Sequence, residues 1–189
     1  MMEQKRLIGL VGANGSGKST ICSYLEKKGF LVISLSDYIR EEADARGLSQ
    51  ERDVLTELSN TLKREEGEAV FAKKAYQKAL SDNVSVVAFD SIRHPKECGY
   101  LRQMGTRLIG VTASTGARYD RISSRGLERD QVNQEIFEKQ DQYERSGQSS
   151  GQNIDACLSV CDARLSNDGS LQDLYDQIEN LLAVEGPLQ

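Results

Sequence analysis

The chain has 189 residues, of which 38% are hydrophobic and 28% charged, and its formal net charge is −5. This balance excludes a disordered chain and predicts one folded domain with a substantial core. The acidic charge does not favour nucleic acid or an anionic membrane as a partner, and no apolar stretch approaches the roughly 20 residues that span a bilayer. With no apolar secretory signal near the N-terminus, we expect a cytoplasmic monomer or homodimer whose partner is a small molecule.

The first informative stretch is an apolar run that ends in a glycine-rich segment. Residues 7–11 (Leu-Ile-Gly-Leu-Val) predict a buried strand, and residues 12–19 fit the pattern G-x-x-x-x-G-K-S/T in full. Glycines let the loop turn its N–H groups inward as an anion-binding nest, and a helix starting near Lys18 adds the positive end of its dipole. A simple turn between a strand and a helix is the alternative, and the complete motif favours nucleotide binding over it.

Two side chains of this motif have an expected ligand of their own. Lys18 is placed for the β- and γ-phosphates of a nucleoside triphosphate, and the Ser19 hydroxyl for Mg²⁺. We therefore predict that ATP and Mg2+ bind at the following residues: Gly12, Ala13, Asn14, Gly15, Ser16, Gly17, Lys18, Ser19 and Thr20.

Short apolar runs separated by helical patterns make up the rest of the chain. These runs lie at residues 30–34, 84–89 and 108–112, with a weaker one at 158–165. The alternation predicts an α/β fold in which a mostly parallel sheet carries helices on both faces, with ligands at the carboxyl ends of the strands. We interpret residues 35–82 as a helical acceptor-binding insertion and residues 114–150 as a short Arg-rich lid of a single domain, 1–189.

Asp37 and Arg40 follow the second predicted strand. The simplest interpretation is that Asp37 caps the next helix and that Arg40 is exposed. In a phosphate-transfer site, Asp37 could orient or deprotonate an acceptor hydroxyl or help to hold the Mg²⁺ waters. Arg40 could bind an acceptor phosphate in bidentate geometry. The neighbouring phosphate-binding loop makes us favour these functional roles.

Asp90 directly follows the apolar residues 86–89, which is the form of a Walker B carboxylate acting on Mg²⁺. Arg93 follows on the same rim and is a second candidate for the acceptor phosphate; a surface salt bridge is its alternative role. The four cysteines lack the paired spacing of a zinc site, and we expect them to be reduced structural thiols.

An arginine row follows the fourth predicted strand. Arg118, Arg121 and Arg125 stand at helical steps of three and four residues, so they should share one face. Such a row is commonly a solvated face, but beside a triphosphate it could neutralise charge on the moving phosphoryl group as a lid closes. We favour Arg121 and Arg125 as the pair that does so.

These motifs together resemble the nucleoside monophosphate kinase-like group of P-loop proteins. Residues 37–40 (Asp-Tyr-Ile-Arg) are similar to the Gly-Asp-Met-Leu-Arg stretch of adenylate kinases, and residues 89–93 (Phe-Asp-Ser-Ile-Arg) to their Asp-Gly-Phe-Pro-Arg stretch. The arginine of each stretch binds the acceptor phosphate in that family. The resemblance thus implies that Arg40 and Arg93 are acceptor-site residues, and it implies a five-stranded sheet of order 2-3-1-4-5.

Two further segments resemble other members of the group. Residues 114–132 and 166–169 (Ser-Asn-Asp-Gly) are similar to dephospho-coenzyme A kinases. This implies lid roles for Arg121 and Arg125 and places Asn167 beside the adenine. Residues 90–95, with the later part of the chain, also resemble P-loop domains fused to deoxycytidylate deaminases.

The resulting hypothesis is an ATP- and Mg²⁺-dependent phosphotransferase that acts on a small phosphorylated acceptor, with a nucleoside or deoxynucleoside monophosphate as the favoured substrate. Lys18, Asp37, Arg121 and Arg125 are its expected catalytic residues. Dephospho-coenzyme A kinase is the alternative enzyme, and a nucleotide-sensing module without turnover is the alternative outside the enzyme class. A nucleic-acid-dependent NTPase is disfavoured by the acidic charge and by an aromatic content of 6%.

Overall fold

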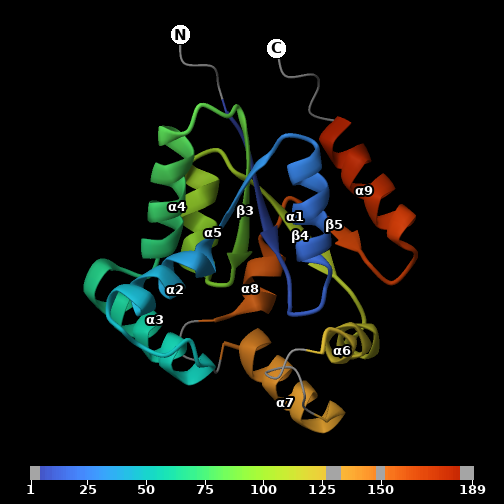
Figure 1. The fold of residues 1–189 in the computed structure, drawn as a ribbon. Helices are drawn as coiled ribbons and strands as arrows, with labels where there is room; N and C mark the ends of the chain where they lie inside the picture. Colours follow the sequence, from blue (N-terminus) through green and yellow to red (C-terminus); the bar gives the residue numbers. More distant parts are fainter. Residues whose placement is uncertain (1–4, 127–132, 148–151, 184–189) are drawn as a thin grey trace.

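The computed structural model describes residues 5–126, 133–147 and 152–183 (Figure 1). Five parallel strands form one sheet in the order β2-β3-β1-β4-β5. The strands are β1 Arg6–Val11, β2 Leu31–Ser34, β3 Val86–Ile92, β4 Arg107–Thr112 and β5 Ala163–Ser166. The predicted fold class and strand order are thereby confirmed.

Helices cover both faces of this sheet. Helices α1 and α9 contact each other on one face, while α4, α5 and α8 cover the other (Figure 1). The helices are α1 Lys18–Lys27, α2 Leu35–Ala45, α3 Arg52–Glu66, α4 Val70–Ser81, α5 Pro95–Gln103, α6 Thr115–Ser124, α7 Gln134–Arg145, α8 Ile154–Ser159 and α9 Leu171–Ala183. Among these described helices, none has both the length and the apolar character needed to cross a bilayer.

The core has two layers because the central strand is apolar on both sides. Ile8 and Leu10 of β1 pack in the cluster that includes α1 and α9, whereas Leu7 and Val11 pack in the cluster that includes α4 and α5. Successive side chains of a strand point to opposite faces, so an uninterrupted apolar run is what a strand covered on both faces requires.

Two predicted strands differ from the structure by more than one residue at an end. Strand β3 continues past residue 89 through Asp90 to Ile92, with a register shift against β1 between Gly9 and Val11. The weak run at 158–165 divides between helix α8 and strand β5. The Asn153 side chain accepts a hydrogen bond from the Ala156 N–H at 2.9 Å and starts α8, so the first residues of that run are helical.

The remaining helices gather beyond the carboxyl ends of the strands, at the lower edge of Figure 1. The predicted insertion at 35–82 contains α2, α3 and α4, and α2 contacts both of the other two. The predicted lid contains α6 and α7, which contact each other; residues 127–132 and 148–150 of it lie outside the described residues. Apart from α4, which covers one face of the sheet, the helices of both segments are therefore on the side where a ligand site is expected.

Candidate functional site

The loop between β1 and α1 encloses the Lys18 side chain. Lys18 is the first residue of α1, is buried, and donates hydrogen bonds from its ammonium group to the carbonyl oxygens of Gly12 at 2.7 Å and Ala13 at 3.0 Å. Burial lowers the pKa of Lys18 to about 8, and the Arg93 cation acts in the same direction while Asp90 opposes it. Charged groups from the ends of β1 and β3 therefore share one electrostatic environment.

Two glycines of this loop have no room for a side chain. A Cβ on Gly12 would lie 2.3 Å from the carbonyl oxygen of Val111, and one on Gly17 would lie 2.1 Å from Nδ2 of Asn167. Gly17 also has φ of +106°, in the region that favours glycine. These contacts fix the shape of the loop, which is followed directly by the positive end of α1.

Asn167, which comes after the edge strand β5, supports this loop. It is buried and donates from Nδ2 to the carbonyl oxygen of Ser16 at 2.9 Å. Its backbone N–H donates to the carbonyl oxygen of Thr112 at 2.7 Å. The Asn167 amide thus holds the phosphate-binding loop in place; its predicted position beside an adenine stays a prediction.

The residues predicted to hold Mg²⁺ have suitable donor atoms. Ser19 is exposed at the start of α1, and Oδ1 of Asp90 is buried without a hydrogen-bond partner among the described residues. A hydroxyl and a carboxylate oxygen are the hard ligands that Mg²⁺ prefers. Within the described part of the chain, no group of three or more His, Cys, Asp or Glu side chains forms another place for a metal.

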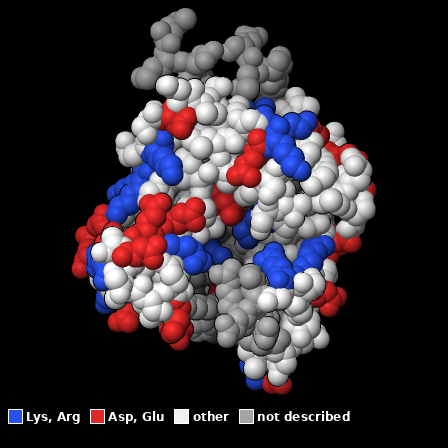
Figure 2. All heavy atoms as spheres, viewed as in Figure 1, with Lys and Arg blue, Asp and Glu red and all other residues white. Residues whose placement is uncertain are grey.

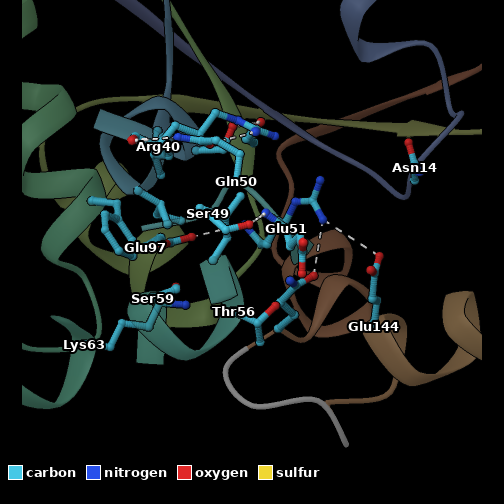
Figure 3. A pocket seen from close by; sticks show the side chains of 18 of the residues that line it. Asn14, Arg40, Ser49, Gln50, Glu51, Thr56, Ser59, Lys63, Glu97 and Glu144 are labelled. Atoms are coloured by element: carbon cyan, nitrogen blue, oxygen red, sulfur yellow. Dashed lines mark hydrogen bonds and ion pairs between the residues drawn. The ribbon is translucent and has the colours of Figure 1, made fainter. Parts of the chain in front are cut away.

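A cavity of about 970 Å³ opens beside the loop (Figure 3). Its walls come from the loop residue Asn14, from α2 and α3, from the end of β3 and from α7. In the space-filling view, Lys and Arg side chains flank a hollow in this face (Figure 2). The charged residues that line the cavity are Arg40, Lys63, Arg93, Arg125, Glu51, Glu97 and Glu144.

The cavity brings the two predicted acceptor arginines together. Arg40 of α2 is half-buried, and its Nη1 lies 3.4 Å from Oε1 of Gln50. Arg93, which follows β3, donates from Nη1 to Oε1 of Gln152 at 3.3 Å and lies 3.8 Å from Oε2 of Glu144. Both arginines line the same cavity, where a guanidinium group could meet an anionic ligand.

The three arginines after β4 have three different surroundings. Arg118 is buried and forms a two-pronged ion pair with Asp141 of α7, including an Nη2–Oδ2 distance of 2.7 Å. Arg121 donates to the carbonyl oxygens of Asn167 at 2.6 Å and Gly15 at 3.4 Å. Arg125 is exposed and lines the cavity. Arg118 therefore anchors α6 to α7, Arg121 contacts the phosphate-binding loop, and Arg125 lines the cavity.

Asp37 lies outside this arrangement. It is exposed on the first turn of α2, and it is absent from the residues that line the cavity, whereas Ser36 and Arg40 are present among them. The alternative interpretation, that Asp37 caps α2, is wrong, because the helix begins at Leu35 and Ser34 takes the N-cap position. The predicted contact of Asp37 with an acceptor stays a prediction without support from this geometry.

Several cavity residues were missed by the sequence analysis, and they include two buried carboxylates. Burial raises the pKa of Glu97, whose Oε2 accepts hydrogen bonds at 3.1 Å from the N–H groups of Arg93 and His94. Glu97 had a sequence signal, since it stands third in a helix that begins with Pro95, where a capping glutamate is expected. Glu144 had no such signal, because only the packing of α7 brings it to the cavity.

Comparison with known proteins agrees with this architecture. A family model described as an AAA domain matches residues 8–143. A UPF0200 protein of Hyperthermus butylicus is 33% identical over 180 residues, which cover 94% of this chain and 94% of that protein. A UPF0200 protein of Thermococcus kodakarensis is 32% identical over 180 residues, which cover 92% and 94% of the two chains.

Two solved structures share the fold at low sequence identity. TT1252 from Thermus thermophilus superposes with a TM-score of 0.63 at 20% identity, over 97% of this chain and 100% of that one. Shikimate kinase from Acinetobacter baumannii, in complex with shikimate, gives a TM-score of 0.58 at 18% identity, over 97% and 96%. The chain therefore has a P-loop kinase-like fold.

Proposed function

The chain belongs to the UPF0200 family, and from its site we propose that it is an ATP- and Mg²⁺-dependent phosphotransferase. The favoured acceptor is a nucleoside or deoxynucleoside monophosphate. One observation carries this proposal: a single cavity has Asn14 of the phosphate-binding loop on one wall and the guanidinium groups of Arg40 and Arg93 on others. Such a cavity has room for an acceptor beside the loop that would hold the donor.

The proposed roles follow from where each group lies. The N–H groups of the loop and the Lys18 ammonium hold the donor phosphates, and Arg121 holds the loop against the turn at Asn167. Mg²⁺, held by Ser19 and Asp90, would supply positive charge to the phosphate oxygens. Arg40 and Arg93 bind the acceptor phosphate, and Arg125 adds a third cation at the cavity wall.

This arrangement suits an acceptor that is already a phosphate. A phosphate oxygen is anionic at neutral pH and attacks without first giving up a proton to a strong base. Catalysis then depends on positioning and on charge neutralisation, and four cationic side chains line the cavity for that purpose: Arg40, Lys63, Arg93 and Arg125.

The size of the cavity keeps dephospho-coenzyme A as a second acceptor. A volume of about 970 Å³ lies at the upper end of the range for small-molecule pockets, so it also suits a ligand larger than a nucleoside monophosphate. A nucleotide sensor would use the same loop and Lys18 but would transfer nothing to either acceptor.

A transfer assay separates these functions. The protein is incubated with Mg²⁺ and ATP labelled in the γ-phosphate, together with each nucleoside and deoxynucleoside monophosphate, dephospho-coenzyme A or shikimate. We expect label to appear in one or a few nucleoside diphosphates. Label in coenzyme A would establish the second acceptor, and label in shikimate 3-phosphate would contradict a phosphate acceptor. Tight ATP binding with no transfer to any member of the panel would establish a sensor.

A further inference from the structure

Ser91 has a backbone conformation that serine rarely adopts. Its φ is +63°, and among the described residues it is the one non-glycine residue with positive φ. An L-residue in this left-handed region is strained because its Cβ approaches the neighbouring carbonyl, and a glycine there would avoid the strain. A serine at this position is therefore informative about what its side chain does.

The strained residue lies at an irregularity of the central sheet. Gly9 of β1 pairs with Phe89 of β3, yet Val11 pairs with Ile92, so β3 has one residue more than β1 across this step. Such bulges occur next to functional sites, where they redirect a side chain. Here the bulge contains Asp90 and Ser91, which lie between the buried apolar residues Phe89 and Ile92, and Ser91 lines the cavity.

The Ser91 hydroxyl forms a hydrogen bond with one carboxylate oxygen of Asp90. Ser91 Oγ donates to Oδ2 of Asp90 at 3.3 Å and accepts from the Ser34 hydroxyl at 3.1 Å. Ser36 Oγ lies 3.4 Å from Ser91 Oγ and 2.9 Å from Ser34 Oγ. Because Ser34 donates to Ser91, the Ser91 proton is directed to Asp90.

The other oxygen of Asp90 is left to bind something else. Oδ1 is buried and has no hydrogen-bond partner among the described residues, while the negative charge of Asp90 acts on Lys18 in the phosphate-binding loop. A buried carboxylate oxygen without a partner is costly unless a ligand binds it. The hydrogen bond from Ser91 thus fixes the carboxylate with one oxygen occupied and the other available beside the loop.

We propose that Ser91 is a positioning residue for the metal site, in which its hydroxyl orients Asp90 so that Oδ1 is presented to the Mg²⁺ that accompanies the nucleotide. The inference rests on the Mg²⁺-nucleotide part of the proposed function and is independent of the acceptor. It also accounts for the strain, because glycine would relax the backbone but would leave the Asp90 carboxylate free to turn.

The test measures how much Mg²⁺ strengthens the binding of ADP. ADP is titrated into the full chain by calorimetry, once with Mg²⁺ and once with EDTA, for the wild type and for Ser91→Gly and Ser91→Ala. We expect the strengthening by Mg²⁺ to fall by about tenfold or more in both variants, as is typical when a partner of a metal ligand is removed. The ADP affinity in EDTA should be unchanged, because the loop and Lys18 are intact.

Two comparisons separate this role from a merely structural one. The control is Ser81→Ala, which removes an exposed hydroxyl at the end of α4. Ser81 precedes β3 and so lies near the amino end of that strand, whereas Ser91 lies near its carboxyl end. In thermal unfolding, Ser91→Gly should have a Tm about 2–4 °C above that of Ser91→Ala, because glycine removes the strain that alanine keeps. If Ser91→Gly is more stable than Ser91→Ala and still loses the strengthening of ADP binding by Mg²⁺, that loss cannot be explained by loss of fold.

The remaining outcomes overturn the proposal. If both variants keep the wild-type strengthening by Mg²⁺, or if Mg²⁺ does not strengthen ADP binding in the wild type, Ser91 does not position a metal ligand. A loss of ADP affinity in EDTA would show damage to the loop instead. Absence of phosphoryl transfer to any acceptor would refute the proposed function, yet it would leave this binding measurement and its result unaffected.

Discussion

Lys18 places an ammonium group inside the loop that precedes it, where two carbonyl oxygens accept its hydrogen bonds. Burial disfavours the charged form and lowers the pKa of Lys18 to about 8, against an ordinary value of 10.5. The cost of burying this charge is present in full below pH 8. As the pH rises from 8 toward 10.5, the folded protein loses the proton before the unfolded chain does, so the Lys18 contribution to stability becomes more favourable.

Nucleotide binding should have the opposite pH dependence, because the phosphates need the protonated ammonium. We expect the affinity for a non-hydrolysable ATP analogue to fall by about tenfold or more between pH 7.5 and pH 9.5. In Lys18→Met the affinity should be weaker throughout and nearly independent of pH over this range. Calorimetric titration in EDTA measures both. A wild-type affinity that stays constant across this range would contradict a direct contact of Lys18 with the phosphates.

Arg40 and Arg93 should act on the acceptor and leave the donor unaffected. We expect Arg40→Ala and Arg93→Ala each to raise the KM for the acceptor by about tenfold or more, since each removes a charge-assisted contact to its phosphate. The KM for ATP should change little. Steady-state kinetics with both substrates varied measures the two effects.

Arg46→Ala is the matched control for the arginine variants. Arg46 directly follows α2, as Arg40 lies within it, but it is exposed and pairs with Glu42 at 2.6 Å on the helix surface. Its removal should leave both KM values near those of the wild type. A change in the KM for ATP as large as that for the acceptor would contradict the division of roles.

At the scale of the helices, α6 and α7 are joined through a buried ion pair. The Arg118 guanidinium contacts both carboxylate oxygens of Asp141, and its Nη1 also donates to the carbonyl oxygen of Asn14 at 3.3 Å. The same helix α7 brings Glu144 to the cavity. Arg118 therefore connects the phosphate-binding loop to the helix that forms one wall of the acceptor cavity.

Removing one member of this pair should destabilise the fold strongly. We expect Asp141→Ala to lower the free energy of unfolding by about 3–5 kcal/mol, because it leaves the buried Arg118 charge without its partner. Urea unfolding measures the loss. The control is Lys139→Ala on the same helix, which breaks an exposed pair with Glu135 and should cost about 0–0.5 kcal/mol. A loss below about 1 kcal/mol for Asp141→Ala would show that α7 is not held by this pair.

The sequence predicted elements well where their pattern is local. The complete glycine motif located the loop and the start of α1 at Lys18. Continuous apolar runs, separated by helical patterns, located the central strands. The row at Arg118, Arg121 and Arg125 was predicted as one face, but helical spacing does not say whether that face meets solvent or protein. Asp141, which buries Arg118, lies 23 residues further along the chain. Only the packing of the two helices reveals it.

For the whole molecule, the sheet determines which segments meet. The strand order β2-β3-β1-β4-β5 places β3 next to β1, so the residues after β3 lie beside the phosphate-binding loop that follows β1. This juxtaposition was predictable for Asp90 and Arg93. It was not predictable for Lys63, Glu144 and Gln152, since they reach the cavity from α3 and from α7 and its following segment, whose docking no local pattern encodes.

We propose above all that one cavity holds an acceptor in line with a triphosphate in the loop. Calorimetric titration of dinucleoside pentaphosphates, each joining adenosine to one nucleoside, tests it most directly. We predict that the compound with the matching nucleoside binds about 100-fold or more tighter than ATP, because its two ends occupy both sites at once. Arg40→Ala should abolish that gain without weakening ATP binding, and Arg46→Ala should preserve it. If no member of the series binds tighter than ATP, the cavity is not the acceptor site.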